Sequence, residues 1–495
     1  MKKNKKQIGK TRHRNNDAST TDLNLIPLCV DLDGTLLKTD TLVESFLLLV
    51  KSQPLKIFKY LYWILKGKSY FKQNIADRVD LDVQTLPYNK KFVDYLTDER
   101  RKGRSLILAT ASNQKIALQT EAHFKLFDYV LASDTSLNLK GQSKLNALVK
   151  RFGDFGFDYA GNSKPDLIIW AHARNALIVN PSMGAKNGVK KLSNVAHVFD
   201  ERPKIFKAVL NGIHARQWPK NILLFVPLIV SQKFLDAHLL FDSVIAFCCF
   251  CLCESSLYII NDLIDLTADR MHPTKCLRPF AAGDLSIISG VVIAIFLLSA
   301  AIIGTLFLPP SFLYFLGFYG ICSFFYSITL KNLAIIDVLI LSGLYTLRIL
   351  AGGIATSIPI SFWLLSFSMF IFFSLAILKR YTELLPMSDK GKIQKIAGRG
   401  YWTNDIETLR ILGISSGYLS VLVMALYINS DQVTVLYKHP SVLWVLCPLL
   451  LFWISRIWLL AGRGQMDDDP VLFAIQDVVS LVVGILTLIV VLSAI

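Results

Sequence analysis

The feature that most constrains the fold is a series of long apolar runs that begins near Asn221 and recurs almost to the last residue. Each run approaches the ~20 residues that an α-helix needs to cross a bilayer. Nine runs can be counted, at about 221–237, 240–260, 285–308, 311–330, 333–355, 358–378, 408–428, 441–461 and 471–494. The pattern predicts an all-α polytopic membrane domain of about nine transmembrane helices over residues 221–495.

The positive charges between these runs indicate how the chain crosses the membrane. If the N-terminus is cytoplasmic, the loops after even-numbered runs are cytoplasmic as well, and lysine and arginine should gather there. Apart from Lys233 and Lys438 they do so, as Arg270, Lys275, Arg278, Lys331, Lys379, Arg380, Lys390, Lys392, Lys395, Arg399 and Arg463. We therefore expect a multi-pass protein of the cell inner (cytoplasmic) membrane, with the polar loops at about 261–284 and 379–407 on the cytoplasmic side.

The residues before the apolar runs form three regions. Residues 1–24 are a basic tail, expected to be disordered, within a chain of formal net charge +16. Such a tail could bind nucleic acid, but ahead of a membrane domain it more simply attracts anionic lipid, so no nucleic-acid partner is expected. Residues 25–200 are long enough for one buried core, and 201–220 link that domain to the membrane. Because the tail leads into polar residues rather than an apolar signal segment, the domain should stay in the cytoplasm.

Short patterns in this front domain point to phosphoryl transfer. Ile26–Val30 reads as a buried strand that ends at Asp31, with Asp33 two positions later and Gly34 and Thr35 to form a tight turn. The first carboxylate suits a nucleophile that attacks phosphorus, and the second suits an acid that protonates the leaving oxygen. Three patterns follow in order: Thr110 after the strand Ser105–Ala109, able to hold a phosphate oxygen; Lys144 at the start of a helix, able to neutralise charge; and Asn162 and Asp166 after another strand, able to hold Mg²⁺.

In this order the patterns resemble the haloacid dehalogenase (HAD) superfamily, over roughly Leu25 to Pro181 with residues 40–100 as a small helical cap. The resemblance implies an α/β Rossmannoid fold and a magnesium phosphatase, in which Asp31, Asp33, Thr110 and Lys144 are catalytic and Asp31, Asp33, Asn162 and Asp166 hold the metal. One residue departs from the pattern, since Asn162 stands where that superfamily usually has aspartate. A retained fold with weak or lost phosphatase activity is therefore an alternative, and a loop-capping role for Asp31 and Asp33 is another.

A second acidic motif follows the second apolar run. The run NDLIDLTADRMHPTKCLRPFAAG begins at Asn261, and its spacings of three and four put Asp262, Asp265 and Asp269 on one face of a predicted helix. Carboxylates at a membrane face are costly to desolvate, so such a cluster indicates a magnesium site more than a solvated helix end. The cations that follow, Arg270, Lys275 and Arg278, suit an anionic substrate.

This run resembles the first aspartate-rich motif of the UbiA superfamily of membrane prenyltransferases. RQWPKN from Arg216 and IDVLILSGLYTLRILAGG from Ile336, which include Lys220 and Arg348, are similar as well. The loop KRYTELLPMSDKGKIQKIAGRGY, from Lys379 through Arg380, Glu383 and Asp389, departs from the second aspartate pair of the aromatic prenyltransferases. It is similar to the branch that moves phosphoribose onto a polyprenyl phosphate, as are HPTKCLRP from His272 and RGQMDDDP from Arg463.

The two resemblances together imply a bifunctional protein with one Mg²⁺ site in each domain. Asn261, Asp262, Asp265 and Asp269 would bind magnesium with the diphosphate of phosphoribosyl pyrophosphate, and a polyprenyl phosphate lipid from the bilayer would accept the phosphoribose. The expected phosphate-binding residues are Lys220, Arg270, Lys275, Arg278, Arg348, Lys379, Arg380 and Glu383. Two alternatives stay open: an aromatic prenyltransferase with a regulatory or prenyl-phosphate-directed front domain, and a non-catalytic membrane anchor for a phosphatase. The sequence leaves the prenyl chain length and the oligomeric state open.

Overall fold

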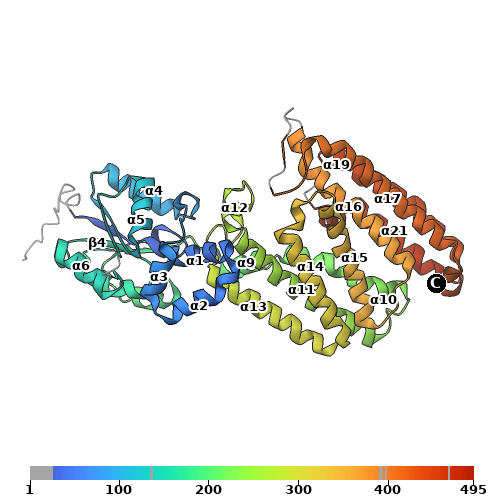
Figure 1. Ribbon diagram of the computed structural model, residues 1–495, viewed down its shortest axis with the longest axis horizontal. Helices are drawn as coiled ribbons and strands as arrows, with labels where there is room; N and C mark the ends of the chain where they lie inside the picture. Colours follow the sequence, from blue (N-terminus) through green and yellow to red (C-terminus); the bar gives the residue numbers. More distant parts are fainter. Residues whose placement is uncertain (1–25, 134–137, 389–393, 396–397, 467–468) are drawn as a thin grey trace, which may run out of the picture. The chain divides into compact units, whose positions relative to one another are not determined.

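The computed structural model describes residues 26–495 apart from 134–137, 389–393, 396–397 and 467–468. The basic tail, Asp389, Lys390, Lys392, Asp467 and Asp468 therefore lie outside the described residues. The chain divides into two compact units (Figure 1): residues 1–208 with 264–287, and residues 209–263 with 288–495. The polar loop that carries Asp265 and Asp269 thus belongs to the same unit as the N-terminal domain.

The first unit is built on a parallel six-stranded sheet in the order β3-β2-β1-β4-β5-β6. Its strands are β1 (Leu28–Val30), β2 (Leu106–Asn113), β3 (Tyr129–Ser133), β4 (Asp158–Gly161), β5 (Ala176–Val179) and β6 (Val195–Phe199). β1 pairs with β2 on one side and with β4 on the other, so that Val30 lies between Leu108 and Ala160. The carboxyl ends of these three central strands consequently meet at one edge of the sheet.

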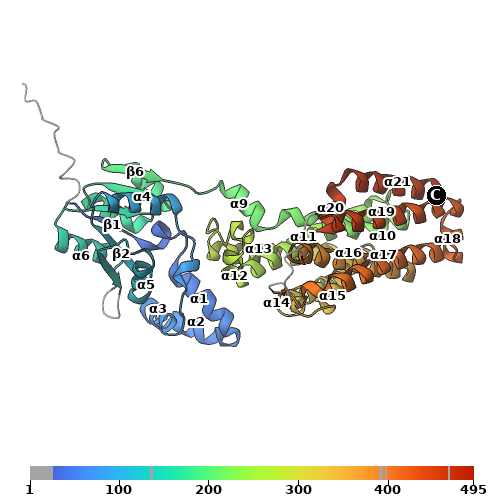
Figure 2. The same cartoon turned by 90° about the horizontal axis from the view of Figure 1, so that it is seen from above.

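Helices cover both faces of the sheet (Figure 2). Because successive strand residues point to opposite faces, Leu28 and Val30 join one core and Cys29 joins the other. The first core also takes residues of α4 (Lys90–Arg101) and α5 (Gln114–Phe124). The second takes residues of α6 (Gln142–Phe152), α7 (Leu167–His172) and α8 (Met183–Val189). This alternation of strand and helix confirms the predicted α/β class.

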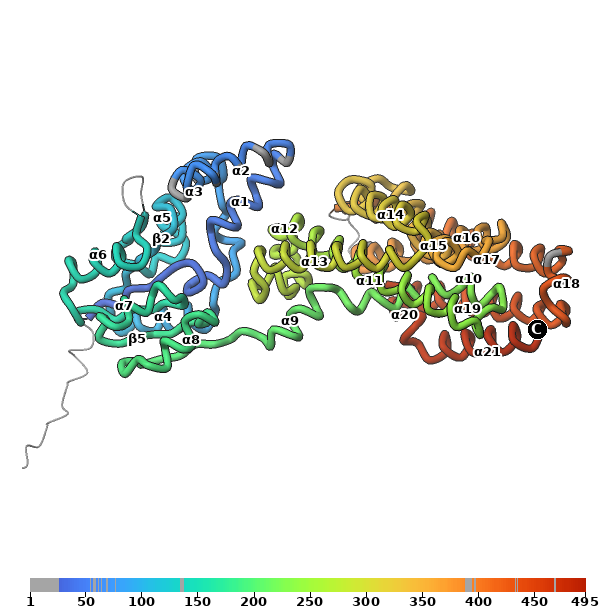
Figure 3. The backbone as a smooth tube through the Cα atoms, turned by 90° about the horizontal axis from the view of Figure 1, so that it is seen from below, coloured from blue at the N-terminus to red at the C-terminus, as the bar shows by residue number. Residues whose placement is uncertain are grey.

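A small helical insert follows β1 (Figure 3), and it has a core of its own. It consists of α1 (Thr41–Ser52), α2 (Ile57–Leu65) and α3 (Lys68–Ala76) around Leu49, Tyr60, Trp63 and Ile75. The predicted cap of 40–100 was too long at its end, because Phe92 and Leu96 of α4 belong to the core of the sheet. Two antiparallel segments join insert and sheet, paired through Leu37 and Tyr88.

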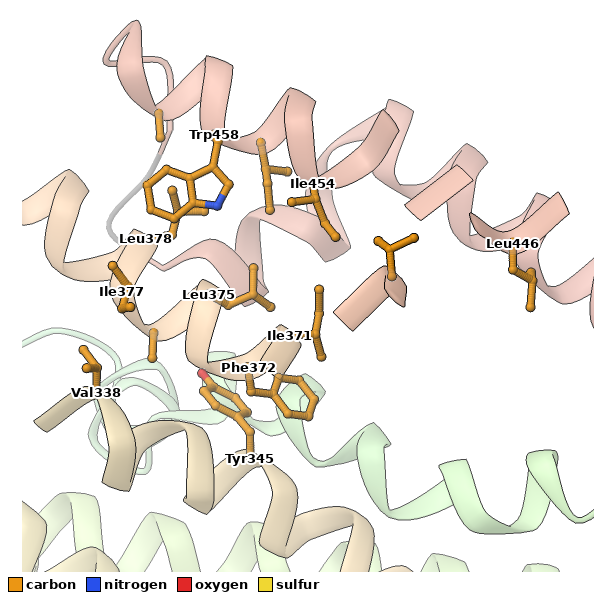
Figure 4. Packing of buried hydrophobic residues seen from close by; sticks show 14 of the residues in the cluster. Val338, Tyr345, Ile371, Phe372, Leu375, Ile377, Leu378, Leu446, Ile454 and Trp458 are labelled. Carbon is orange, nitrogen blue, oxygen red and sulfur yellow. The ribbon is translucent and has the colours of Figure 1, made fainter. Parts of the chain in front are cut away.

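The second unit consists of long apolar helices. After α9 (Ile205–Gly212), the 3₁₀-helix η6 (Ala215–Phe225) and the short α10 (Val226–Val230), it contains α11 (Ala237–Ile264), α13 (Ile287–Gly304), α14 (Pro310–Ile328), α15 (Ile336–Thr356), α16 (Phe362–Ser388), α17 (Ile406–Ile428), α18 (Asp431–Leu436), α19 (Leu446–Gly462), α20 (Pro470–Gln476) and α21 (Val478–Ala494). Its main core lies between α15, α16, α17 and α19, where Tyr345 stacks on Phe372 at 5.2 Å between ring centroids (Figure 4).

Fewer helices could span a membrane than the sequence predicts. Within the described residues seven helices are long and apolar enough, or eight if the bent pair α20 and α21 is one span. The predicted count of nine was therefore too high. Within the described residues, the run at 221–237 is the predicted span that forms no helix long enough to cross a membrane. It contains the end of η6 and the five residues of α10 rather than one long α-helix, because Pro219 and Pro227 interrupt regular α-helical hydrogen bonding.

The segment that replaces this first span is nevertheless long. At about 2.0 Å per residue of 3₁₀-helix and 1.5 Å per residue of α-helix, Ala215–Val230 extends roughly 30 Å, the thickness of a hydrocarbon core. It packs tightly on α15, where a Cβ added to Gly352 would lie 2.0 Å from the carbonyl oxygen of Leu224. The absence of a side chain at Gly352 is thus what allows this close approach.

Candidate active sites

The N-terminal site lies at the carboxyl edge of the sheet, where β1 ends at Asp31. Asp31 Oδ1 accepts hydrogen bonds from Lys144 Nζ at 2.8 Å and from the backbone N–H of Leu32 at 2.9 Å. Lys144, near the start of α6, also bonds to the hydroxyl of Tyr159 at 3.0 Å, and that hydroxyl donates to Asp166 Oδ1 at 3.0 Å. The structure thus brings Asp31, Lys144 and Asp166 together in one buried chain of polar groups.

Asp33 and Thr110 lie at the same edge. Asp33 accepts a hydrogen bond from the N–H of Thr41 at 2.9 Å and one from the hydroxyl of Ser112. The hydroxyl of Thr110 is buried and accepts from the N–H of Ser112 at 3.0 Å. Ser112 therefore joins the two predicted residues, and its place two residues beyond Thr110 was the available sequence signal for it.

Asn162 lies against the loop that follows Asp31. A Cβ added to Gly34, which has φ = +74°, would lie 2.0 Å from Asn162 Nδ2, so glycine is favoured there by its backbone conformation and leaves the space that the Asn162 side chain occupies. Asp166 Oδ2 is engaged locally, by the N–H groups of Asn162 at 3.1 Å and Ser163 at 2.8 Å. Within the described structure the buried hydroxyl of Thr35 has no hydrogen-bond partner, which leaves a donor for an added oxygen group.

The electrostatics of this edge fit a bound cation. Burial raises the pKa of Asp31 to about 6, helped by the negative charge of Asp166 and opposed by Lys144. Burial and the negative charge of Asp40 raise the pKa of Asp33 to about 7. Within the described structure no three Asp, Glu, His or Cys side chains converge to hold a metal alone. Mg²⁺ usually uses one or two carboxylates with waters and substrate phosphates, so Asp31, Asp33 and Asn162 are a chemically suitable set.

The aspartate loop, residues 264–287, differs from its predicted shape. α11 ends at Ile264, and the short α12 (Leu266–Met271) begins after Asp265, whose φ of −89° and ψ of 8° interrupt the helix. Asp262 therefore lies on α11 and Asp269 on α12, and the prediction that the three carboxylates share one regular helix was wrong. Spacing alone could not show this break, because the residues around Asp265 are ordinary helix formers.

Two acids of this motif contact basic residues, one of them distant in the sequence and the other in the same loop. Asp262 is buried and lies 2.8 Å from His214 Nε2. Asp269 is buried and accepts from Arg278 Nη1 at 2.8 Å, with Lys275 Nζ at 4.0 Å. Asp265 and Asp269 offer the oxygen ligands that Mg²⁺ prefers, and Lys275 and Arg278 bring cations to the same loop. Asn261 and Asp262 offer ligands of the same kind at the end of α11.

Two of the predicted phosphate-binding lysines converge on one carboxylate in the membrane unit. Lys220, from η6, forms a buried ion pair with Asp469, and Lys379, near the end of α16, lies 3.4 Å from the same oxygen. Burial opposes ionisation of Asp469, but the two lysine charges outweigh it and lower its pKa to about 2. Asp469 is the last acid of RGQMDDDP, a segment singled out from the sequence. The sequence did not indicate that Lys220 and Lys379 would be the partners of Asp469.

The predicted arginines are enclosed in two buried networks. Arg348 pairs with Glu254 of α11 and donates to Asn221 Oδ1 at 2.9 Å, and Tyr319 donates to the same glutamate. Arg380 has no exposed side-chain surface and pairs with Asp337 and with Glu383 at 2.7 Å. These contacts bring Arg380 and Glu383 together, whereas Lys220 and Lys379 share Asp469 as their partner. Glu254 was missed because a single acid within an apolar run gives no sign of its partner.

Removing the carboxylate of Asp469 should destabilise the membrane unit. In Asp469→Asn, the buried Lys220 would lose its partner beside the like charge of Lys379, whose side chain is 25% exposed. Losing one partner of a buried ion pair typically costs about 3 kcal/mol or more. We expect the apparent Tm of the purified protein in detergent to fall by roughly 5 °C. Glu407→Gln, at an exposed pair 3.9 Å from Arg410, is the matched control and should change the Tm little. Equal Tm values for the two variants would show that the lysines do not depend on Asp469.

Sequence comparison assigns the membrane part of the chain to a family. The model of the UbiA prenyltransferase family matches residues 224–476. The chain belongs to the UbiA prenyltransferase family, and it is accordingly a UbiA-type membrane protein with several spanning helices. The matched segment leaves out the parallel-sheet α/β domain.

Several known proteins are similar to this chain. An uncharacterized protein of Sinorhizobium fredii, y4nM, is 35% identical over 96% of this chain and 93% of its own length. The decaprenyl-phosphate phosphoribosyltransferase of Mycobacterium tuberculosis is 34% identical over 180 residues, which cover 36% of this chain and 60% of that enzyme. Among solved structures, a UbiA homolog from Archaeoglobus fulgidus bound to GPP and Mg²⁺ is 14% identical with a TM-score of 0.43, over 57% of this chain and 99% of that one.

Proposed function

We propose that the membrane unit transfers phosphoribose from phosphoribosyl pyrophosphate to a polyprenyl phosphate at the cytoplasmic face of the inner membrane. The observation that carries the proposal is the 34% identity to a decaprenyl-phosphate phosphoribosyltransferase. The matched segment covers only part of that enzyme, so the residues of this chain must supply the rest of the argument. In the sequence, lysines and arginines outnumber acids in the loop 379–407, which suits a substrate with several phosphates better than a second metal.

The proposed transfer is a displacement at the anomeric carbon. A phosphate oxygen of the lipid forms a bond to that carbon, the bond between the carbon and the diphosphate oxygen breaks, and the diphosphate leaves with the electron pair. Asn261, Asp262, Asp265 and Asp269 would hold Mg²⁺, which when bound supplies positive charge for the departing diphosphate. Lys275 and Arg278 would bind phosphate oxygens from the same loop, and Lys220 and Lys379 would bind others in exchange for their contact with Asp469.

The N-terminal domain is proposed to be a HAD-type phosphatase that removes the 5-phosphate of the transferred group. Support comes from Asp31 at the end of β1, held by Lys144, with Asp33 at the same edge. Asp31 would attack the phosphorus atom, and Asp33 would protonate the oxygen that leaves with the ribose; water then releases phosphate from Asp31. Asn162, in place of the usual aspartate, gives a bound metal one negative charge fewer. We nevertheless expect phosphatase activity.

A two-donor assay tests the transfer. Purified protein would receive Mg²⁺ and polyprenyl phosphate with labelled phosphoribosyl pyrophosphate, and in parallel labelled geranyl diphosphate with 4-hydroxybenzoate. We expect label from the phosphoribosyl donor to enter the lipid fraction, because the basic residues recognise a donor with several phosphates. Label transferred only from geranyl diphosphate to the aromatic acceptor would replace the proposal with aromatic prenyl transfer.

A further inference from the structure

The aspartate loop makes a buried ion pair with the N-terminal domain. Arg270 donates to both carboxylate oxygens of Glu44, at 2.6 and 3.2 Å, and also donates to the backbone carbonyl of Ala281 at 3.2 Å. The side chains of Arg270 and Glu44 are 7% and 3% exposed. Glu44 is in the first turn of α1, so this contact joins two segments that are 226 positions apart in the sequence.

Two further contacts fix the end of the same loop. Lys38 Nζ lies 3.3 Å from Asp284 Oδ1. Gly283 has φ = +73°, and a Cβ added to it would lie 2.7 Å from Lys38 Cβ and 3.1 Å from Pro87 Cγ. A side chain at Gly283 would thus push the loop away from the domain.

The contacts of Lys38 and Pro87 fall on the two segments that connect the helical insert to the sheet, and Glu44 lies in the first turn of the helix that follows one of them. We call residues 37–40 and 86–89 the hinge segments; they are joined to each other by the bridge between Leu37 and Tyr88 and by the bond from the N–H of Lys38 to the carbonyl of Pro87 at 2.9 Å. The hinge segments lead directly into the candidate site. The hydroxyl of Thr39 donates to Glu44 at 2.7 Å, and the carbonyl of Thr39 accepts from the N–H of Gly34 at 3.2 Å. The N–H of Thr41, the first residue of α1, donates to Asp33.

A buried ion pair contributes little net stability compared with a well-packed apolar pair, but losing one partner leaves a buried charge uncompensated. Its effect is therefore to fix one arrangement of the two segments. Arg270 follows Asp269 directly in the chain, so the pair fixes the backbone at the acidic motif itself.

We propose that Glu44 and Arg270 are positioning residues for the transferase, and that the N-terminal domain holds the aspartate loop in its working arrangement through the hinge segments. Arg270 then acts through Glu44 rather than by binding a substrate phosphate. The expected effect of Glu44 and Arg270 on transfer rests on the proposed function, whereas the contact between the aspartate loop and the N-terminal domain does not. The fusion of the two domains has a mechanical role in this account: without the α/β domain the loop loses the partner that orders it.

Docking of the loop can be measured without any substrate, from the rate at which trypsin cleaves the chain after Lys275. Trypsin can reach this residue because it lies in the exposed part of the loop. Glu44→Gln and Arg270→Met should each accelerate that cut about tenfold in the full-length protein, as the loop loses its buried contact. The double variant leaves no unpaired buried charge and should be no worse than either single variant. Asp80→Asn is the control, since Asp80 makes an exposed pair with Lys115 at 2.9 Å in the same domain. Unchanged cleavage in both single variants would overturn the docking.

Transfer kinetics then test the positioning role. Glu44→Gln should lower kcat/KM for transfer from phosphoribosyl pyrophosphate about tenfold or more, in parallel with Arg270→Met, and the double variant should recover part of the loss. If Arg270 instead bound a phosphate directly, Arg270→Met would raise KM while Glu44→Gln kept parental kinetics, and the positioning role would be wrong. A parent protein that transfers nothing from phosphoribosyl pyrophosphate would refute the proposed function, and the cleavage rates would still decide the docking.

Discussion

Asp265→Asn is expected to lower phosphoribose transfer about 100-fold or more while the protein stays folded, because the substitution removes one negative charge from the proposed magnesium site at nearly constant volume. Asp265 lies at the break between α11 and α12, and its backbone carbonyl accepts from the N–H of Asp269 at 2.8 Å. The amide side chain leaves that backbone bond in place. The measurement is the initial rate of label transfer into lipid, with the Tm as a check on folding.

The matched control for this variant is Asp431→Asn, which changes an exposed carboxylate at the start of another short helix, α18. It should keep the parental rate. A rate for Asp265→Asn above about a tenth of the parental value would count against metal binding at this residue.

Asp31→Asn should change which lipid accumulates. The parent is expected to yield a polyprenyl-phosphoryl-ribose lipid, and the variant should stop at the lipid that still bears its 5-phosphate. The reason is that Asp31 is the proposed nucleophile, held 2.8 Å from Lys144, and an amide of the same shape cannot attack phosphorus at a useful rate. Mass analysis of the extracted lipid separates the two products by one phosphate group.

Asp94→Asn, at an exposed position on α4, is the control for this experiment and should give the parental product. If the parent itself stops at the phosphorylated lipid, the N-terminal domain does not act on this product. Its remaining role would then be to hold the aspartate loop.

The N-terminal site could be predicted closely from the sequence because of the geometry of parallel sheets. The apolar runs before Asp31, Thr110 and Asn162 predict strands, and the structure shows β1, β2 and β4 side by side with their carboxyl ends at one edge. Residues that follow such strands meet in space without any further information. Lys144 joins the site because it lies near the start of α6, the helix that connects β3 to β4 and packs on the sheet.

The membrane unit was predicted less completely, for local and for long-range reasons. Apolar composition located the helices, but it could not distinguish a regular span from the 3₁₀ segment with Pro219 and Pro227, nor show the interruption at Asp265. The pairs between Glu254 and Arg348 and between Glu44 and Arg270 join residues 94 and 226 positions apart, and no spacing rule within one sequence reaches so far. These pairs had to be read from the structure.

A doubly labelled donor tests the central claim most directly. Purified full-length protein would be incubated with Mg²⁺, polyprenyl phosphate and phosphoribosyl pyrophosphate carrying one radiolabel in the ribose ring and a second in the 5-phosphate. The account predicts that both labels enter the lipid together, after which the phosphate label passes into the aqueous phase while the ribose label stays. Failure of the ribose label to enter the lipid at any time would contradict it.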